Sequence, residues 1–189
     1  LITNFFVGFE YSFLLNLGIT TFWVILLVSA INAIDNMDGL ATGLALIAGL
    51  MFFVVGALQF PQPIWALISI GFVGALLGFL PFNFYPSTIF LGDSGSFLLG
   101  FVLAVLSIMG RWSSHPLKAI IIPLVILMIP IMDLVFVLLY RYVTGETDSL
   151  LESIEYSARD HLSHRIQEVR NFGQRRTVVI VYVLGLISG

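Results

Sequence analysis

The sequence predicts an all-α protein, a polytopic bundle of transmembrane helices. Hydrophobic residues make up 59% of the 189 residues, only 10% are charged, and the mean hydropathy is +1.04. The apolar share and the mean hydropathy lie far above those of a soluble globular domain, and the charged share lies far below it. A bilayer core is spanned by about 20 consecutive apolar residues, and about five stretches of that length occur, followed by a shorter one. We therefore expect about five complete membrane helices and one truncated helix.

The expected helices follow one another with loops of polar residues, Gly and Pro between them. They cover residues 13–31, 40–58, 64–82, 96–110 and 117–140, and the truncated helix begins at Thr177. We expect residues 1–189 to form a single integral membrane domain. Because the first residue is not Met and the last helix stops in mid-span, we interpret the chain as the C-terminal part of a longer protein.

Lys and Arg are divided unequally between alternate loops. Six arginines fall between residues 141 and 176, whereas the opposite loops hold one Arg and one Lys. By the positive-inside rule the loop at 141–176 is cytoplasmic. Alternation then puts the loops around Asp35 and Asp93 on the same side, together with every other acidic residue except Glu10 and Asp133. An enzyme that joins a cytosolic substrate to a lipid would gather polar groups in this way, whereas a transporter would bring them toward the midplane.

The segment FLGDSGS, residues 90–96, puts a carboxylate beside a predicted helix N-terminus. Its two glycines allow close backbone approach. Ser94 and Ser96 are good N-cap residues for the helix that follows. A helix N-terminus binds anions, and Mg²⁺ is typically held by one or two carboxylates plus substrate phosphates. Asp93 is therefore the candidate ligand of Mg²⁺, with Mn²⁺ as an alternative; simple capping of the helix by Asp93 is the other interpretation.

A second polar cluster lies in the segment SAINAIDNMDGL. Asn32, Asp35 and Asp38 recur every three residues, a spacing that puts them on one face of a helix. Two carboxylates and an amide at the end of a membrane helix cost solvation energy unless they meet a cation or a polar substrate. The alternative is a solvated helix end with Gly39 as a stop signal.

The segment ARDHLSHRIQEVRNFG has helical periodicity. The i, i+3, i+4, i+7 spacing is followed by His161, His164, Arg165 and Glu168, and apolar residues form the other face. We expect an amphipathic helix on the cytoplasmic surface, within the 141–176 loop, whose polar face suits a diphosphate. A zinc site is disfavoured because the chain has no cysteine. A basic helix that binds anionic lipids is the alternative interpretation.

Two further polar residues stand out within apolar surroundings. Asp133 is the one acid inside an apolar helix, and Pro130 loosens the backbone one turn before it. An intramembrane acid is functional by default, although helix packing also explains it. Asn83 lies between two phenylalanines and offers a base-binding corner for a nucleotide.

Together these motifs resemble the polyprenyl-phosphate N-acetylhexosamine-1-phosphate transferase family, the integral membrane enzymes that begin bacterial cell-wall and surface-glycan assembly. The family's four motifs are matched in order by Asn32, Asp35 and Asp38–Leu40, by Phe82, Asn83, Pro86 and Phe90–Ser96, by Pro130 and Asp133, and by Asp160, His161, His164 and Arg165. All four fall on one predicted side of the membrane.

The resemblance implies a Mg²⁺-dependent phosphotransferase in the bacterial plasma membrane with a cytoplasmic active site. A polyprenyl phosphate would attack the β-phosphorus of a UDP-sugar, most plausibly UDP-GlcNAc, and release UMP. The implied catalytic residues are Asp93, Asp35, Asp38, His161, His164 and Arg165; the implied substrate-binding residues are Asn32, Asn83, Ser94, Gly95 and Asp133. Nucleic acid is not an expected partner, and a homodimer is compatible with the family.

The chain departs from the family pattern in three ways. An upstream cytoplasmic segment with adjacent aspartates and a lysine is absent, Ser29 stands where many relatives have Asn, and the acidic spacer at 145–158 is long. Because the upstream segment helps to build the family's active site, we expect these residues alone to be an incomplete catalyst. A cation-coupled transporter that uses Asp133 and the interfacial aspartates, or an inactive remnant, remains the alternative.

Overall fold

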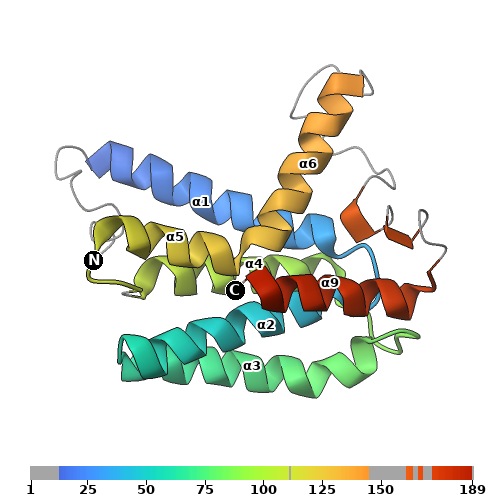
Figure 1. The fold of residues 1–189 in the computed structure, drawn as a ribbon, viewed down its shortest axis with the longest axis horizontal. Helices are drawn as coiled ribbons and strands as arrows, with labels where there is room; N and C mark the ends of the chain where they lie inside the picture. The colour runs from blue at the N-terminus through green and yellow to red at the C-terminus, as the bar shows by residue number, and fades with distance from the viewer. Residues whose placement is uncertain (1–12, 111, 145–160, 164–165, 168–171, 189) are drawn as a thin grey trace.

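The computed structural model describes residues 13–110, 112–144, 161–163, 166–167 and 172–188. Its helices are α1 (Phe13–Ile34), α2 (Leu40–Val54) with the π-helical turn η2 (Val55–Gln59), α3 (Pro63–Asn83), α4 (Gly92–Met109), α5 (Pro116–Ile126), α6 (Met128–Thr144) and α9 (Gln174–Ser188). Four helical segments are long and apolar enough to cross a membrane: α1, α2 with η2, α3 and α4. The bent pair α5 and α6 makes a fifth if it counts as one span. The predicted all-α membrane bundle is confirmed (Figure 1).

α2 lies at the centre of the bundle and the other helices pack around it. It contacts α1, α3, α4, α5 and α9, and it is the most buried of the four spans. The core is formed by apolar side chains that include Leu27, Ile31, Leu44, Phe52 and Leu103. This central place explains why a helix of small and aliphatic residues carries almost no polar side chain apart from Thr42.

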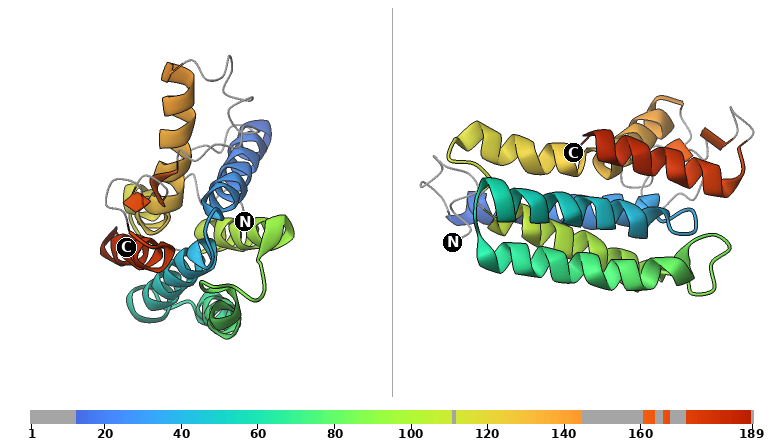
Figure 2. Two further views of the ribbon diagram at one scale, coloured as in Figure 1. Left: turned by 90° about the vertical axis from the view of Figure 1, so that its right-hand side faces the viewer. Right: turned by 60° about the horizontal axis from the view of Figure 1, so that its bottom comes forward.

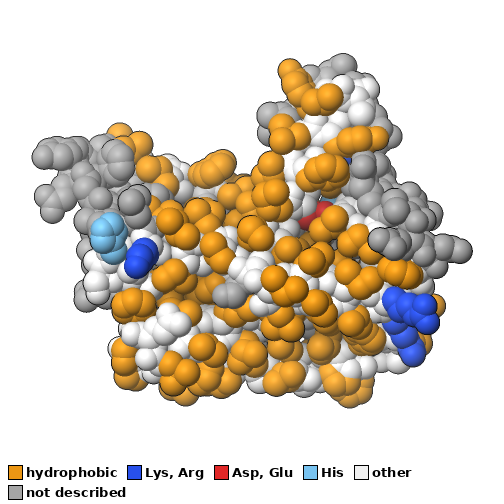
Figure 3. Space-filling model, viewed as in Figure 1, with side chains coloured by type: hydrophobic (Ala, Val, Ile, Leu, Met, Phe, Trp, Pro, Cys, Tyr) orange, Lys and Arg blue, Asp and Glu red, His pale blue; other side chains and the backbone are white. Residues whose placement is uncertain are grey.

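The outer faces of the spans are apolar. Phe22 is 64% exposed, Leu67 72% and Leu98 60%. On the face drawn in Figure 3, apolar side chains cover the middle of the molecule, and basic side chains lie toward its two ends. Such a surface matches the hydrocarbon core of a bilayer with polar layers on either side. The chain is an integral membrane protein.

The helix predicted over 117–140 is two helices rather than one. α5 ends at Ile126 and α6 begins at Met128, with a bend of 75° between them. Pro130 explains the break, because it has no N–H to donate and its ring would clash with the Ile126 carbonyl in a continuous helix. In the first turn of a new helix the same residue is tolerated. Leu127, at the break, is fully buried, so its backbone is shielded from lipid.

The bend turns α6 away from the other helices. Figure 1 and the left view of Figure 2 show α6 projecting from the bundle, with only its first turns against the neighbouring helices. Along its length α6 exposes apolar side chains such as Phe136 and Val143, whereas Asp133 near its start is buried. The bend therefore brings a carboxylate into the bundle, while one face of α6 remains apolar and exposed.

Three connections gather at one end of the bundle (Figure 1). They are the turn at 35–39 between α1 and α2, the loop at 84–91 between α3 and α4, and residues 172–173 before α9. The connections at 60–62 and 112–115 lie at the opposite end. As predicted from the alternation of the loops, those that carry Asp35 and Asp93 lie at the same end of the bundle.

Close approach of α1 and α4 depends on Gly100. A Cβ atom at this position would lie 2.6 Å from Val28 Cα and 2.9 Å from the Leu27 carbonyl oxygen, both of them backbone atoms that cannot rotate away. Small residues at such contacts let membrane helices pack closely.

We expect Gly100→Ala to destabilise the protein by about 1–3 kcal/mol, the usual cost of overpacking. The matched control is Gly74→Ala in α3, where an added Cβ would meet nothing within 4 Å; this change should be neutral or stabilise by roughly 0.5–1 kcal/mol, because Ala favours the helix. Thermal unfolding in detergent measures both. Equal effects of the two substitutions would contradict the close α1–α4 contact.

Candidate functional site

The turn at 35–39 carries the first predicted cluster. α1 ends at Ile34, so of the three residues predicted to share a helix face only Asn32 lies on the helix, and Asp35 and Asp38 lie in the turn. The Asn36 side-chain amide donates to the Ala33 carbonyl at 3.3 Å, a local hydrogen bond that competes with helix continuation. The prediction of one common helix face is therefore wrong, although the three residues stay close together.

The surroundings of Asp35 disfavour the charged form of its carboxyl group. Its burial, together with the negative charges of Asp93 and Asp38, raises the pKa of the Asp35 carboxyl from 3.8 to about 6. Burial is the largest cause because it disfavours the charged form, and the two neighbouring carboxylates act in the same direction. The electrostatic effect of Asp93 on Asp35 indicates that acids from two motifs distant in sequence lie near one another at this end of the bundle.

Asp93 lies in the first turn of α4. Gly92 begins the helix with a φ of +66°, a backbone conformation that favours glycine. The helix therefore starts earlier than predicted, and Ser94 and Ser96 lie inside its first turns instead of capping it. Asp93 is exposed, and its negative charge is favourable at a helix N-terminus. Ser94 is also exposed, and Gly95 is half-buried.

Ser96 connects this helix start to α1. Its hydroxyl oxygen lies 2.7 Å from Asn32 Oδ1 and 3.0 Å from the Asp93 carbonyl oxygen. Ser96 is buried and Asn32 is half-buried. The hydrogen bond thus fixes the Asp93 turn relative to the end of α1, where Asp35 begins the turn.

Asn83 holds the loop that precedes Asp93. Its side-chain oxygen accepts a hydrogen bond from Thr42 at 2.7 Å, and its side-chain nitrogen donates to the Ile89 carbonyl at 3.1 Å. The residue is 3% exposed. Both ends of the amide are therefore engaged inside the protein, and the assignment of Asn83 to a nucleotide base stays a prediction.

The same loop is tied at two further points. The Ser87 backbone N–H donates to Asp38 Oδ2 at 3.1 Å. From the start of α9, Arg175 Nε donates to the Tyr85 carbonyl at 3.0 Å, and its guanidinium carbon lies 5.8 Å from the centre of the Tyr85 ring, within the range of cation–π attraction. Elements from the beginning, middle and end of the chain thus position one loop.

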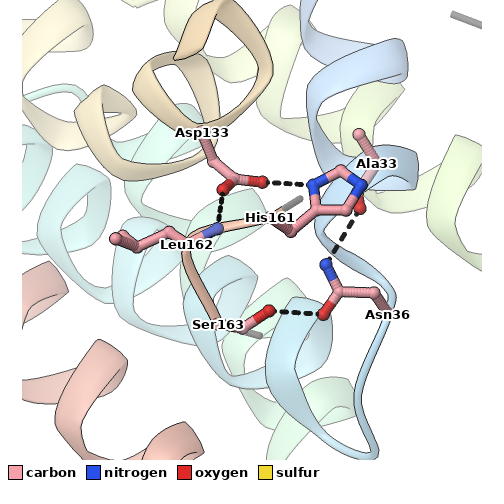
Figure 4. A network of polar contacts seen from close by, with 6 residues as sticks. All are labelled: Ala33, Asn36, Asp133, His161, Leu162 and Ser163. Atoms are coloured by element: carbon pink, nitrogen blue, oxygen red, sulfur yellow. Dashed lines mark hydrogen bonds and ion pairs between the residues drawn. The ribbon is translucent and has the colours of Figure 1, made fainter. Parts of the chain in front are cut away.

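The second group of contacts centres on Asp133, which is 2% exposed. His161 Nδ1 lies 2.8 Å from Asp133 Oδ2, and the Leu162 backbone N–H donates to Asp133 Oδ1 at 2.7 Å. Figure 4 shows the imidazole ring between Asp133 and the C-terminal end of α1. Two predicted site residues that are 28 positions apart in the sequence are therefore brought into direct contact.

A second hydrogen bond holds the same short segment. The Ser163 hydroxyl donates to Asn36 Oδ1 at 2.7 Å, and Asn36 is itself fixed by its bond to Ala33 (Figure 4). Residues 161–163 are thus attached both to α6 and to the turn at 35–39. This links the histidine motif to the cluster around Asp35.

The rest of the histidine motif lies outside the described residues. This holds for Asp160, His164, Arg165 and Glu168, and for most of the amphipathic helix predicted around them. In the part of the chain that the structure describes, no group of three or more His, Asp or Glu side chains could hold a metal ion by itself.

Sequence reasoning missed the residues that tie the motifs together. These connections are made by Asn36, Ser163 and Arg175. None of the three is among the residues that define a motif or a helical spacing. Asn36 lies one residue beyond Asp35, and Arg175 is one of the six arginines that indicate the cytoplasmic side. For Ser163 the only available signal was its place between the two histidines.

Residues 1–111 match the sequence family described as "Glycosyl transferase family 4". The match covers more than half of the chain. The chain belongs to glycosyl transferase family 4. The resemblance drawn from the four motifs is thereby confirmed.

Several named members of this transferase group are similar to the chain. It is 35% identical over 169 residues to a Bacillus subtilis protein named "Probable undecaprenyl-phosphate N-acetylglucosaminyl 1-phosphate transferase", covering 89% of this chain and 45% of the relative. It is 32% identical over 199 residues to a Mycobacterium tuberculosis decaprenyl-phosphate N-acetylglucosaminephosphotransferase, covering 94% and 46%. It is 32% identical over 168 residues to a Staphylococcus epidermidis phospho-N-acetylmuramoyl-pentapeptide-transferase, covering 89% and 48%. The chain spans about half the length of these relatives.

The raised pKa of Asp35 predicts a pH-dependent stability for this family 4 chain. Between pH 3.8 and about 6 the folded protein binds more protons at Asp35 than the unfolded chain does, so this contribution to stability is lost as the pH rises through that window. We expect Asp35→Asn, which carries no charge, to be more stable than the parent at pH 7 and nearly equal to it at pH 4.

Thermal unfolding of both proteins in detergent, with EDTA present so that no cation relieves the repulsion, measures this difference. A stability gap of the same size at both pH values would show that the charge of Asp35 is not the cause.

Proposed function

We propose that the full-length protein transfers a sugar-1-phosphate from a UDP-sugar to a polyprenyl phosphate at the cytoplasmic face of the bacterial plasma membrane, and so begins the synthesis of a cell-wall or surface glycan. Membership of glycosyl transferase family 4 and the names of the similar proteins support this assignment. The observation that carries it is the meeting of Asp35, Asp38 and Asp93, which come from two motifs, at one end of a membrane bundle.

In the proposed reaction an oxygen of the lipid phosphate forms a bond to the β-phosphorus of the UDP-sugar. The bond between that phosphorus and the oxygen bridging to the α-phosphate breaks, and UMP leaves with that oxygen. Little covalent chemistry falls to the protein in such a transfer, because most of the rate comes from positioning and from neutralising charge. The tied loop at 84–91 and the fixed start of α4 provide rigid backbone for that purpose.

The acidic cluster fits a divalent cation. A group of three protein ligands is not needed, because Mg²⁺ is commonly held by one or two carboxylates together with substrate phosphates. Asp93 would be the ligand, with Asp35 beside it. A cation there would offset both the burial of Asp35, which is the main cause of its raised pKa, and the repulsion from Asp93 and Asp38. A bound Mg²⁺ or Mn²⁺ would supply neutralisation of the diphosphate charge.

The remaining assignments follow from the site motifs. His161, with His164 and Arg165 of the same motif, would neutralise charge on the transferred phosphate, while Asn32, Ser94 and Gly95 would line the nucleotide-sugar site. The isoprenoid chain would lie against the apolar surface of the spans. The arginines of the 141–176 segment support a cytoplasmic location.

The names of the similar proteins indicate which donor sugars to test first. N-acetylglucosamine is our first choice, because the Bacillus and Mycobacterium relatives are named for it. The Staphylococcus relative is named for a phospho-N-acetylmuramoyl-pentapeptide, so a UDP-linked muramoyl peptide is the second donor to test.

A transporter is a poorer fit to the same observations. Cation coupling would require acids along a path through the membrane. Among the described residues, Asp133 is the only buried acid within a membrane helix, and internal hydrogen bonds occupy both of its carboxylate oxygens.

The proposal predicts that Asp93→Asn abolishes turnover, lowering it by about a thousandfold or more, because charge neutralisation at the diphosphate is lost. The assay is UMP release by the full-length protein in detergent, with polyprenyl phosphate, Mg²⁺ and a panel of UDP-sugars, repeated with EDTA. We expect metal-dependent release with one donor.

The matched control is Asp148→Asn, the same chemical change outside the four motifs, which should leave turnover unchanged. Thermal unfolding checks that both variants are folded. Turnover of folded Asp93→Asn within tenfold of the parent would remove Asp93 from the metal site, and no UMP release by the folded parent with any donor would refute the transferase assignment.

A further inference from the structure

We propose that Asp133 is a positioning residue that acts through His161. Its carboxylate accepts a hydrogen bond from the Nδ1–H of the imidazole, and this fixes both the ring orientation and the tautomer, so that the unprotonated Nε2 faces the reacting phosphates. There Nε2 takes the proton of the lipid phosphate as the phosphate oxygen bonds to the β-phosphorus, and the imidazolium so formed neutralises charge before it returns the proton to water. The inference rests on the proposed function, in which His161 takes part, and it gives Asp133 a different task from the substrate contact predicted from the sequence.

The geometry of the pair supports this assignment. Asp133 Oδ2 lies 2.8 Å from His161 Nδ1, and the side chains of Asp133 and His161 are 1% and 12% exposed. At this distance one of the two atoms must carry a proton. Beside a carboxylate that proton stays on the ring nitrogen, and the carboxylate accepts the hydrogen bond. Nε2 has no hydrogen-bond partner among the described residues, and the ring lies beside the end of α1, near the acidic turn (Figure 4).

The second carboxylate oxygen explains why this position needs an acid. Oδ1 accepts the Leu162 backbone N–H at 2.7 Å, so two donors face one side chain. A carboxylate accepts at both oxygens, whereas an asparagine has one acceptor and one donor group. A buried N–H without an acceptor is costly, so an amide at position 133 would keep its oxygen on Leu162 and turn its NH₂ toward the imidazole.

That arrangement would reverse the tautomer of His161. An NH₂ that faces Nδ1 can donate only if Nδ1 carries no proton, and the ring proton then moves to Nε2. The neutral ring would no longer have an acceptor at the nitrogen that faces the substrate. Asp133→Asn therefore preserves the size, the packing and one of the two hydrogen bonds while it changes the nitrogen that carries the proton.

A purely structural role for Asp133 makes a different prediction. If its task were only to fix residues 161–163 to α6, an amide that still accepts from Leu162 would largely suffice. The segment is also held by the hydrogen bond from Ser163 to Asn36, which does not touch the imidazole. Ser163→Ala is therefore the matched control, because it weakens the attachment of the segment and leaves the Asp133–His161 contact in place.

The first experiment is a double-mutant cycle in the full-length protein, with UMP release as the assay. We expect Asp133→Asn to lower kcat by about 10²–10⁴-fold, the usual scale for the loss of a correctly held proton-transfer group, with the KM for the UDP-sugar changed by less than about threefold. In the His161→Ala background, Asp133→Asn should cause almost no further loss, since residues that act as one unit are not additive. Ser163→Ala should lower kcat by a few-fold at most.

The second experiment determines the tautomer of His161 directly and needs no activity assay. In spectra of ¹⁵N-histidine-labelled protein in lipid, the His161 signals are those that disappear in His161→Ala. We expect a proton on Nδ1 in the parent and its transfer to Nε2 in Asp133→Asn. Because the parent spectrum alone shows whether Nδ1 of His161 carries a proton, the proposal is tested even if Asp133→Asn does not fold.

Three results would overturn the proposal: Nδ1 of the parent without a proton, a kcat of folded Asp133→Asn within threefold of the parent, or fully additive losses in the cycle. Failure of the proposed function is distinguishable, because it would appear as an inactive parent whatever the tautomer of His161.

Discussion

The organisation of this protein follows from one constraint: backbone polar groups within a bilayer must find their hydrogen bonds inside the protein. Helices satisfy the constraint along the spans, so irregular backbone is confined to the two ends of the bundle. The exception, the break after Ile126, is tolerated because Leu127 is fully buried. Only where the chain is free of this constraint can loops from several spans approach one another, and the candidate site is built at such a place.

The polar residues of the motifs hold the site together as well as line it. Ser96 joins the start of α4 to Asn32, Asn83 fixes the loop before Asp93, and Asp38 accepts a backbone N–H from the same loop. Such charge-assisted and buried hydrogen bonds provide the rigidity that the proposed phosphoryl transfer requires. A motif residue of this kind can therefore matter for the proposed reaction without touching a substrate.

The sequence predicted the spans well because long apolar runs have few alternatives in a bilayer. It did not predict the break in the last predicted full span, since a proline within an apolar run can kink a helix, end it or begin another. The residue types of the site were also readable, because acids, amides and histidines are expensive at a membrane. Their pairings were not: nothing in the local sequence connects Asp133 with His161, or Asn36 with Ser163, because tertiary structure alone brings them together.

The hydrogen bond between the Tyr182 hydroxyl and the Gly39 carbonyl has a consequence for biosynthesis. It joins residues 143 positions apart, so α9 reaches the turn beside the acids only after all the intervening spans have been made. At bacterial or eukaryotic elongation rates of about 5–20 residues per second, that interval lasts roughly 7 to 30 s. During this time the acids of the turn at 35–39 are already at the membrane surface without the helix that contacts this turn. The membrane insertion machinery and the surrounding water must accommodate those charges until α9 arrives.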